Sequence, residues 1–260
     1  MAESSDNYFS KTIEKGFFIL NLFDRDHPNW GITEISQVSG INKTSTYRFV
    51  NTLVTLGYLK KNQKNKQLKL GPKVLLLGHN FLNGFDLMQI TKPLIDKAFR
   101  KYNVTIDSSL YYEKALLALY RREAPNTIFF RQPLTSKDLY ARAMGKAVLS
   151  KMEENELNAF FKEICFEKFT PKTLVRKEDV IAEIEATKRR GYSINNEEFI
   201  PGIIGIGAPL INYQTKKVIG AISFDFPVSE QSIDSIIKNY TGALTKLSHD
   251  ISEMMTMTEG

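Results

Sequence analysis

The chain has 260 residues, of which 42% are hydrophobic and 25% charged, and its formal net charge at pH 7 is +6. This composition excludes a disordered chain, and one large or two modest domains are expected. No apolar run approaches the roughly 20 residues that a membrane helix needs, and the N-terminus lacks the apolar stretch of a signal peptide. Because Cys165 is the single cysteine, an internal disulfide is excluded. We therefore expect a cytoplasmic protein without membrane contact.

The positive charge is concentrated in one segment. Between Ile35 and Phe85 there is no Asp or Glu, whereas eight Lys or Arg residues occur there. The rest of the chain holds 35 − 8 = 27 basic residues against 29 acidic ones, so it is close to neutral. A local basic segment of this kind is typical of a polyanion-binding surface, although a solvated charged face is the alternative interpretation.

The first 71 residues predict three helices followed by a β-hairpin. Apolar residues at helical spacing indicate helices over 11–23, 32–40 and 43–56, with Asn42 placed to cap the third. Residues 58–71 predict two short strands joined by a tip rich in Asn and Lys. This order is typical of a winged helix-turn-helix, in which the second helix of the motif enters the DNA major groove.

The N-terminal half of the predicted helix 43–56 is rich in hydrogen-bond donors. Arg48 can grip a phosphate or make a bidentate contact with guanine, and the short polar side chains beside it can reach base edges. The predicted DNA-binding residues, including the lysines of the wing, are Thr33, Lys43, Thr44, Ser45, Tyr47, Arg48, Asn51, Lys60, Lys61, Lys64 and Lys66. The alternatives are an ordinary solvated helix and a winged helix that binds protein.

The remaining sequence predicts a linker and a larger second domain. Residues 72–103 indicate a linker helix and a second long helix; the apolar run 74–77 packs either against another subunit or within its own chain. Strands are expected at 104–113, 115–123, 127–131, 203–211 and 217–226. Helices are expected at 139–152, 153–166 and 177–190, and a last one is expected to begin at a Ser229 cap. Helices flanking a mostly antiparallel sheet indicate an α+β domain. The expected boundaries are 1–71, 72–85 and 86–260.

Residues that could support catalysis are sparse. The three histidines lie in unrelated segments and give no zinc-ligand spacing, so we expect no metal and no cofactor. Cys165 is interpreted as a buried small hydrophobe. The glycines of residues 202–209 lack the G-x-G-x-x-G spacing of a dinucleotide site. Glu197 and Glu198 are interpreted as a solvated acidic loop, and no catalytic residue is predicted.

Four stretches carry a resemblance to a known family. They are ITEISQVSGINKTSTYRFVNTL with LGYL, then YARAMGKAVL, RGYSINNEEFIPGIIGIGAPL and VIGAISFDFP. In this order the sequence resembles the IclR family of bacterial transcription regulators from about residue 11 to residue 255. The resemblance implies a winged helix-turn-helix, a linker helix that mediates dimerisation and a GAF-like effector-binding domain. It also implies a homodimer or homotetramer, a double-stranded DNA operator, a small-molecule metabolite effector and, as the expected sign, repression.

The resemblance also places the effector pocket. The implied residues are Tyr140, Arg142, Ala143, Met144, Gly145, Asn195, Gly205, Ser223 and Asp225. Gly205 stands where the family frequently has cysteine, so its backbone N–H is expected to face the ligand. Asp225 stands where serine is common, and Tyr140 and Arg142 stand where histidine and a small residue are common. A buried Asp225 repels a carboxylate unless it is protonated or paired, for instance with Arg142, so a small keto acid is not assumed.

Two other classes of function were weighed against a regulator. One is a metabolite-binding protein or enzyme with a vestigial DNA-binding head, and the other is a protein-interaction scaffold. Neither needs a segment of fifty residues without acids, so the sequence favours a ligand-responsive DNA-binding regulator.

Overall fold

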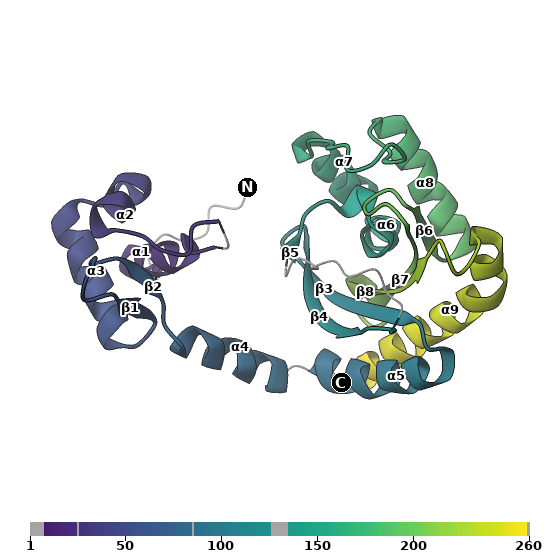
Figure 1. Ribbon diagram of the computed structural model, residues 1–260, viewed down its shortest axis with the longest axis horizontal. Coiled ribbons are helices and arrows are strands. Elements are labelled where there is room, and N and C mark those ends of the chain that lie inside the picture. The colour runs from purple at the N-terminus through teal and green to yellow at the C-terminus, as the bar shows by residue number, and fades with distance from the viewer. Residues whose placement is uncertain (1–7, 25, 85, 126–134, 259–260) are drawn as a thin grey trace. The chain divides into compact units, whose positions relative to one another are not determined.

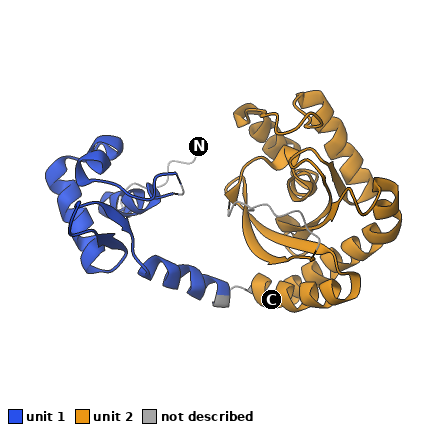
Figure 2. Ribbon diagram, in the orientation of Figure 1, with its two compact units in different colours: residues 1–84 blue, residues 85–260 orange. Residues whose placement is uncertain are grey.

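The computed structural model describes residues 8–24, 26–84, 86–125 and 135–258, which form two compact units, residues 1–84 and 85–260 (Figures 1 and 2). The division falls after the linker helix α4 (Lys73–Gly84), which belongs to the first unit. The strand expected at 127–131 lies outside the described residues.

The first unit has the predicted helices and hairpin. Its elements are α1 (Lys11–Asn21), α2 (Ile32–Ser39), α3 (Lys43–Thr55), β1 (Leu59–Lys61) and β2 (Leu68–Leu70). Asn42 caps α3, since its Oδ1 accepts the Ser45 N–H at 2.9 Å, and Gly40 ends α2 in the left-handed region at φ 65°. Ile35 and Val50 join the three helices and the hairpin into one apolar core. The winged helix-turn-helix prediction is confirmed.

Apolar side chains remain exposed on α4. Leu75, Leu76, Leu77 and Phe81 are between 51% and 74% exposed. The first unit by itself therefore does not bury the apolar run of the linker.

The second unit is built on a six-stranded antiparallel sheet with the order β5-β4-β3-β8-β7-β6. Its strands are β3 (Thr105–Tyr112), β4 (Ala115–Arg122), β5 (Thr135–Ser136), β6 (Ser193–Asn196), β7 (Ile203–Asn212) and β8 (Lys217–Pro227). Side chains alternate between the two faces, so Ile222 and Phe224 of β8 lie on opposite faces from Ser223 and Asp225. The α+β prediction for this part of the chain is confirmed.

Helices cover both faces of this sheet (Figure 1). On the apolar face, α5 (Asp86–Tyr102) and α9 (Ile233–Thr258) pack on residues such as Ile106, Ile206 and Phe224. On the other face lie the short 3-10 helix η1 (Leu139–Ala141) and α6 (Ala143–Leu149), with α7 (Glu154–Glu163) and α8 (Lys177–Arg190) beyond them. Asp107, Ser223 and Asp225 are on this second face.

Three local expectations were wrong. The helix expected at 139–152 is interrupted at Arg142, whose backbone is extended, because η1 folds back until Leu139 lies against Gly145. The last helix begins at Ile233 instead of following Ser229, and Ser232 Oγ accepts the Ser235 N–H at 3.3 Å. Cys165 is exposed and is not a buried hydrophobe.

Candidate functional site

The predicted recognition helix presents its donor side chains to solvent. Lys43, Thr44, Tyr47 and Arg48 are exposed on α3. Thr33, at the start of α2, is exposed too. The first turn therefore keeps several free donors, as a helix that enters a DNA groove requires.

Two of the predicted DNA-binding residues are less available. Ser45 is partly buried, and its N–H is used by the Asn42 cap. Asn51 is also partly buried, one turn further along α3. Their reach toward a nucleic acid is therefore shorter than that of Arg48.

The hairpin holds its lysines on a rigid turn. Asn62 Oδ1 accepts the Lys64 N–H at 2.8 Å, and the Asn62 N–H donates to Gln67 O at 2.8 Å. This is the local bonding by which asparagine stabilises a turn. Lys60, Lys64 and Lys66 are exposed, while Lys61 is partly buried with its Nζ 6.0 Å from the centre of the Tyr47 ring.

The second unit contains a small cavity of about 50 Å³ between the sheet, α6 and the loop after β6. It is lined by Arg142, Ala143, Met144, Asn195, Phe199, Ile200, Ile203, Gly205, Ser223 and Asp225. Seven of the nine residues that the sequence assigned to an effector pocket are therefore brought together. Tyr140 and Gly145 are not among the lining residues.

Tyr140 and Gly145 make structural contacts outside the cavity. The Tyr140 hydroxyl donates to Glu167 O at 2.8 Å and accepts the Glu167 N–H at 2.6 Å, and its ring packs edge-on against Phe166. Gly145 lies so close to Leu139 that an added Cβ would overlap the Leu139 backbone. Both residues shape the turn from η1 into α6, which in turn places Arg142 and Ala143 at the cavity.

Two cross-strand rows of residues lie on the face of the sheet that the cavity adjoins, and Asn195, Gly205, Ser223 and Asp225 from these rows line it. In one row, Asn195 pairs with Gly205, and Gly205 pairs with Asp225. The second row runs through Ser193, Gly207, Ser223, Asp107 and Arg121. Because alternate residues of a strand share a face, both rows project toward α6.

The glycines in the two rows have no side chains, so neighbouring groups can pack directly against the sheet. A Cβ at Gly207 would lie 2.7 Å from the backbone of Ala143, so α6 begins directly on the sheet. A Cβ at Gly205 would lie 2.8 Å from Asp225 Oδ1. The expectation that the Gly205 N–H faces the ligand was wrong, because β7 has a hydrogen-bonded strand on each side and its N–H groups lie in the plane of the sheet.

Arg142 brings a buried positive charge to the cavity. The residue is 8% exposed, its Nε donates to Asp138 Oδ2 at 3.0 Å, and its guanidinium lies 3.5 Å from the centre of the Phe199 ring. Burial lowers the pKa of Arg142 from its ordinary value, while Asp138 opposes that change. Among the described residues, no hydrogen bond is made by its two terminal nitrogens.

Asp225 belongs to a pair of carboxyl groups. Burial and the charge of Asp225 raise the pKa of Asp107 well above its ordinary value, although Arg121 Nη1 lies 2.6 Å from Asp107 Oδ2. Burial also raises the pKa of Asp225, but hydrogen bonds from Asp107 and Ser223 oppose the rise. The larger rise at Asp107 favours Asp107 as the proton donor of the pair and Asp225 as the acceptor that faces the cavity.

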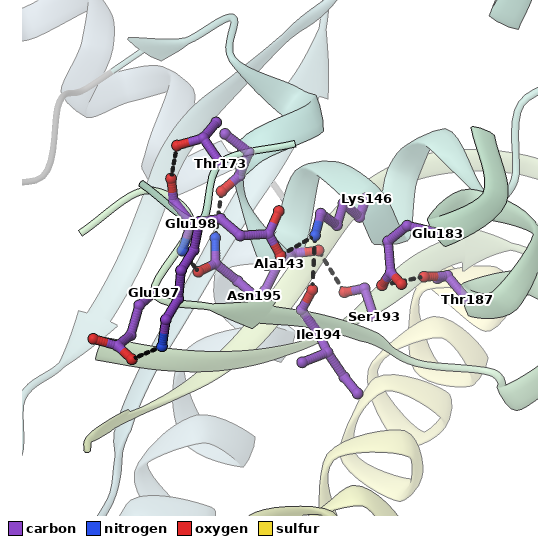
Figure 3. Close-up of polar contacts among 12 residues, drawn as sticks. Ala143, Lys146, Thr173, Glu183, Thr187, Ser193, Ile194, Asn195, Glu197 and Glu198 are labelled. Carbon is purple, nitrogen blue, oxygen red and sulfur yellow. Dashed lines mark hydrogen bonds and ion pairs between the residues drawn. The ribbon is translucent and has the colours of Figure 1, made fainter. Parts of the chain in front are cut away.

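A buried polar network holds the wall of the cavity in place (Figure 3). Lys146 Nζ donates to Glu198 Oε1 at 2.5 Å and to Ile194 O at 2.9 Å. Asn195 donates to Ala141 O and accepts the Glu198 N–H at 3.0 Å, so its amide joins η1 to the loop after β6. Glu198 is buried, so the interpretation of both glutamates as a solvated loop was wrong. Glu197 forms an ion pair with Lys172 on the surface side.

Several cavity residues were not anticipated from the sequence. Phe199 and Ile200 lie in the loop after β6, and a loop gives no periodicity from which their direction can be read. Ile203 begins β7 and shares the face of Gly205. Asp107 and Arg121 approach Asp225 only because β8 pairs with β3 and β3 with β4. Within the described ranges, no group of three or more His, Cys, Asp or Glu could hold a metal ion. In the same ranges, no helix is long and apolar enough to cross a membrane.

A winged helix-turn-helix in one unit and an α+β unit with a polar cavity in the other define a transcription regulator of the ligand-responsive class. The chain matches the family described as Bacterial transcriptional regulator IclR C-terminal over residues 79–253 and the IclR helix-turn-helix domain over residues 12–63. It therefore belongs to the IclR family.

Named relatives are similar over most of their length. The HTH-type transcriptional regulators XynR and KdgR of Escherichia coli (strain K12) are both 26% identical, over 214 and 250 residues. The alignments cover 82% of this chain and 84% of XynR, and 94% of this chain and 92% of KdgR. The crystal structure of an IclR homolog complexed with 4-hydroxybenzoate from Microbacterium hydrocarbonoxydans has the same fold. Its TM-score is 0.76 at 16% identity, with 95% of this chain and 99% of that chain covered.

Proposed function

We propose that the protein is a cytoplasmic homodimeric or homotetrameric repressor that binds a double-stranded operator through α3 and the wing and is controlled by a small molecule in the cavity of the second unit. The observation that carries the DNA part is the position of Arg48. It is exposed on the recognition helix, in a segment of fifty-one residues that contains no acid. Phosphates of a duplex supply the counter-charges that this segment lacks.

The exposed apolar face of the first unit supports self-association. A groove of about 600 Å³ lies beside α1, α3 and α4 and is lined by apolar residues that include Phe17, Leu56 and Leu77. Leu75 and Leu76 continue the apolar surface along α4. A second copy of the chain that covers this surface removes it from water. The resulting dimer has two recognition helices, which can enter successive major grooves about 34 Å apart.

The cavity supports control by a ligand. Arg142 and Asp225 bring opposite charges to one small space, and small residues such as Gly205 and Ala143 keep it open. A ligand regulates DNA binding only when it binds one arrangement of the protein more tightly than the other. The crystallised homolog that holds 4-hydroxybenzoate supports a small-molecule effector for this chain as well.

A salt titration tests the DNA part. Binding of the full chain to the DNA upstream of its own gene is compared with binding to a scrambled duplex of the same length and composition. We expect preference for the upstream DNA and a steep fall of affinity with salt, because lysines release counterions from phosphates. Equal and weak binding to both duplexes, with or without effector, would contradict the proposal.

Light scattering tests self-association. Replacing Leu76 with glutamate places a charge in the exposed apolar face of α4, and we expect the oligomer to dissociate. Lys151→Glu, an exposed change in the second unit, is the control and should leave the mass unchanged. A monomeric wild-type protein at micromolar concentration would contradict the proposed assembly.

A further inference from the structure

The cavity contains a buried cation with unused donors. Asp138 occupies only the Nε of Arg142, and the terminal nitrogens make no hydrogen bond among the described residues. Phe199 covers one face of the guanidinium and keeps it from bulk water. A buried guanidinium whose terminal nitrogens lack acceptors is costly, and a carboxylate matches two parallel N–H donors of this group. One end of the ligand is therefore anionic.

Asp225 imposes the opposite requirement on the rest of the ligand. Burial raises the pKa of the Asp225 carboxyl, whereas hydrogen bonds from Asp107 and Ser223 and the charges of Arg121 and Arg142 lower it and favour the ionised form. A second carboxylate or a carbonyl oxygen beside it would set acceptor against acceptor. The group that reaches Asp225 must therefore be a donor, and Gly205 leaves the space for it, since a Cβ there would lie 2.8 Å from Asp225 Oδ1.

The size of the cavity limits the distance between the two groups. A cavity of about 50 Å³ has room for roughly three or four water molecules. Anion and donor therefore sit on neighbouring atoms of a compact molecule. Arg121 and Arg142 lower the pKa of Asp225 by their charges, yet among the described residues neither forms an ion pair with it. An ammonium group on the ligand supplies that ion pair, which a hydroxyl group cannot do.

We propose that the effector site put forward above binds a compact zwitterion of the α-amino acid type, with its carboxylate on Arg142 and its ammonium group on Asp225. The inference rests on the proposed effector function. It separates this chain from a binder of small keto acids, which offer an acceptor where Asp225 needs a donor.

Three molecules with the same carbon skeleton test this assignment. Racemic alanine, lactate and pyruvate differ only in whether an ammonium group, a hydroxyl group or a keto oxygen stands next to the carboxylate. Binding of each to the full chain is measured by ligand-observed NMR up to about 10 mM, a range that detects weak complexes. We expect alanine to bind at least about tenfold more tightly than either competitor, since a hydrogen bond to a charged group is lost in both.

Two variants locate the preference. Asp225→Asn keeps the shape of the side chain and should bring the affinity ratio of alanine to pyruvate close to one. Gly205→Ala pushes against Asp225 Oδ1 and should weaken alanine more than pyruvate. Asp234→Asn, an exposed change in the first turn of α9, is the matched control and should leave the ratio unchanged. Circular dichroism confirms that each variant is folded.

The outcomes are decisive in both directions. Pyruvate or lactate binding as tightly as alanine overturns the ammonium assignment, and so does the absence of binding by all three. A ratio that is unchanged in both Asp225→Asn and Gly205→Ala overturns the placement at Asp225. Failure of these tests with operator binding intact rejects only the ligand class, whereas loss of specific DNA binding by the wild type rejects the regulator function itself.

Discussion

Lys146 and Glu198 form an ion pair in the interior of the second unit, with Nζ 2.5 Å from Oε1 and none of the lysine side chain exposed. The pair joins α6 to the loop that carries Phe199 and Ile200 into the cavity. Glu198 Oε2 is buried and has no hydrogen-bond partner among the described residues, and burial raises the pKa of this carboxyl group. The ion pair therefore uses only one of the two oxygens of the Glu198 carboxylate.

Removing one partner of this pair should be costly. Lys146→Met leaves the Glu198 carboxylate buried and unpaired, and we expect the free energy of unfolding to fall by about 3–5 kcal/mol. The double variant Lys146→Met, Glu198→Leu removes both charges and should recover most of that loss. Urea unfolding of the three proteins measures this. A double variant no more stable than the single one would show that packing, and not the charge, is what Lys146 provides.

Arg48 should carry a large share of operator affinity. Arg48→Ala is expected to weaken specific binding by about 1–3 kcal/mol if the guanidinium contacts a base. Fluorescence anisotropy with the upstream duplex measures the effect, and Arg100→Ala, an exposed change on α5, is the control. Equal affinity of Arg48→Ala and wild type would show that α3 does not meet the duplex through this residue.

Asp107 should make stability depend on pH. Its pKa in the folded protein lies well above the ordinary 3.8, so the folded state keeps a proton that the unfolded chain releases. This contribution is fully present below 3.8 and is lost as pH rises toward the folded pKa, by up to about 1.4 kcal/mol per pH unit.

Asp107→Asn isolates this effect, because an amide donates to Asp225 and accepts from Arg121 without titrating. Relative to wild type, the variant should gain stability as the pH rises above 3.8 toward the raised pKa of Asp107, measured by urea unfolding. Asp250→Asn, whose carboxylate lies at the surface beside Lys246, should show no such gain. A stability difference that does not change with pH would mean that Asp107 is ionised in the folded protein.

Two glycines in helices should respond in opposite ways to alanine. A Cβ at Gly145 would overlap the Leu139 backbone, so Gly145→Ala should cost about 1–3 kcal/mol. Gly242 lies inside α9 with nothing within 4 Å of the added atom, so Gly242→Ala should stabilise by about 0.5–1 kcal/mol. Thermal unfolding followed by circular dichroism compares them. A neutral Gly145→Ala would show that η1 can move away from α6.

The sequence by itself determined those features of the fold that depend on residues close together along the chain. The helical spacing of apolar residues over 11–23, 32–40 and 43–56, the Asn42 cap and the acid-free segment predicted a winged helix-turn-helix, because periodicity, capping and charge are local properties of the chain. The same holds for β8, where alternation alone put Ser223 and Asp225 on one face. The resemblance supplied the positions of Arg142, Asn195 and Gly205.

Only the tertiary structure decided how these residues interact. Asp107 meets Asp225, and Lys146 meets Glu198 from 52 positions away, because strand pairing and the seating of α6 bring distant segments together. Glu197 and Glu198 are adjacent, yet one is paired at the surface and the other is buried, a difference that no local pattern contains. Burial and pairing depend on the whole fold, and the charge state of the cavity follows from them.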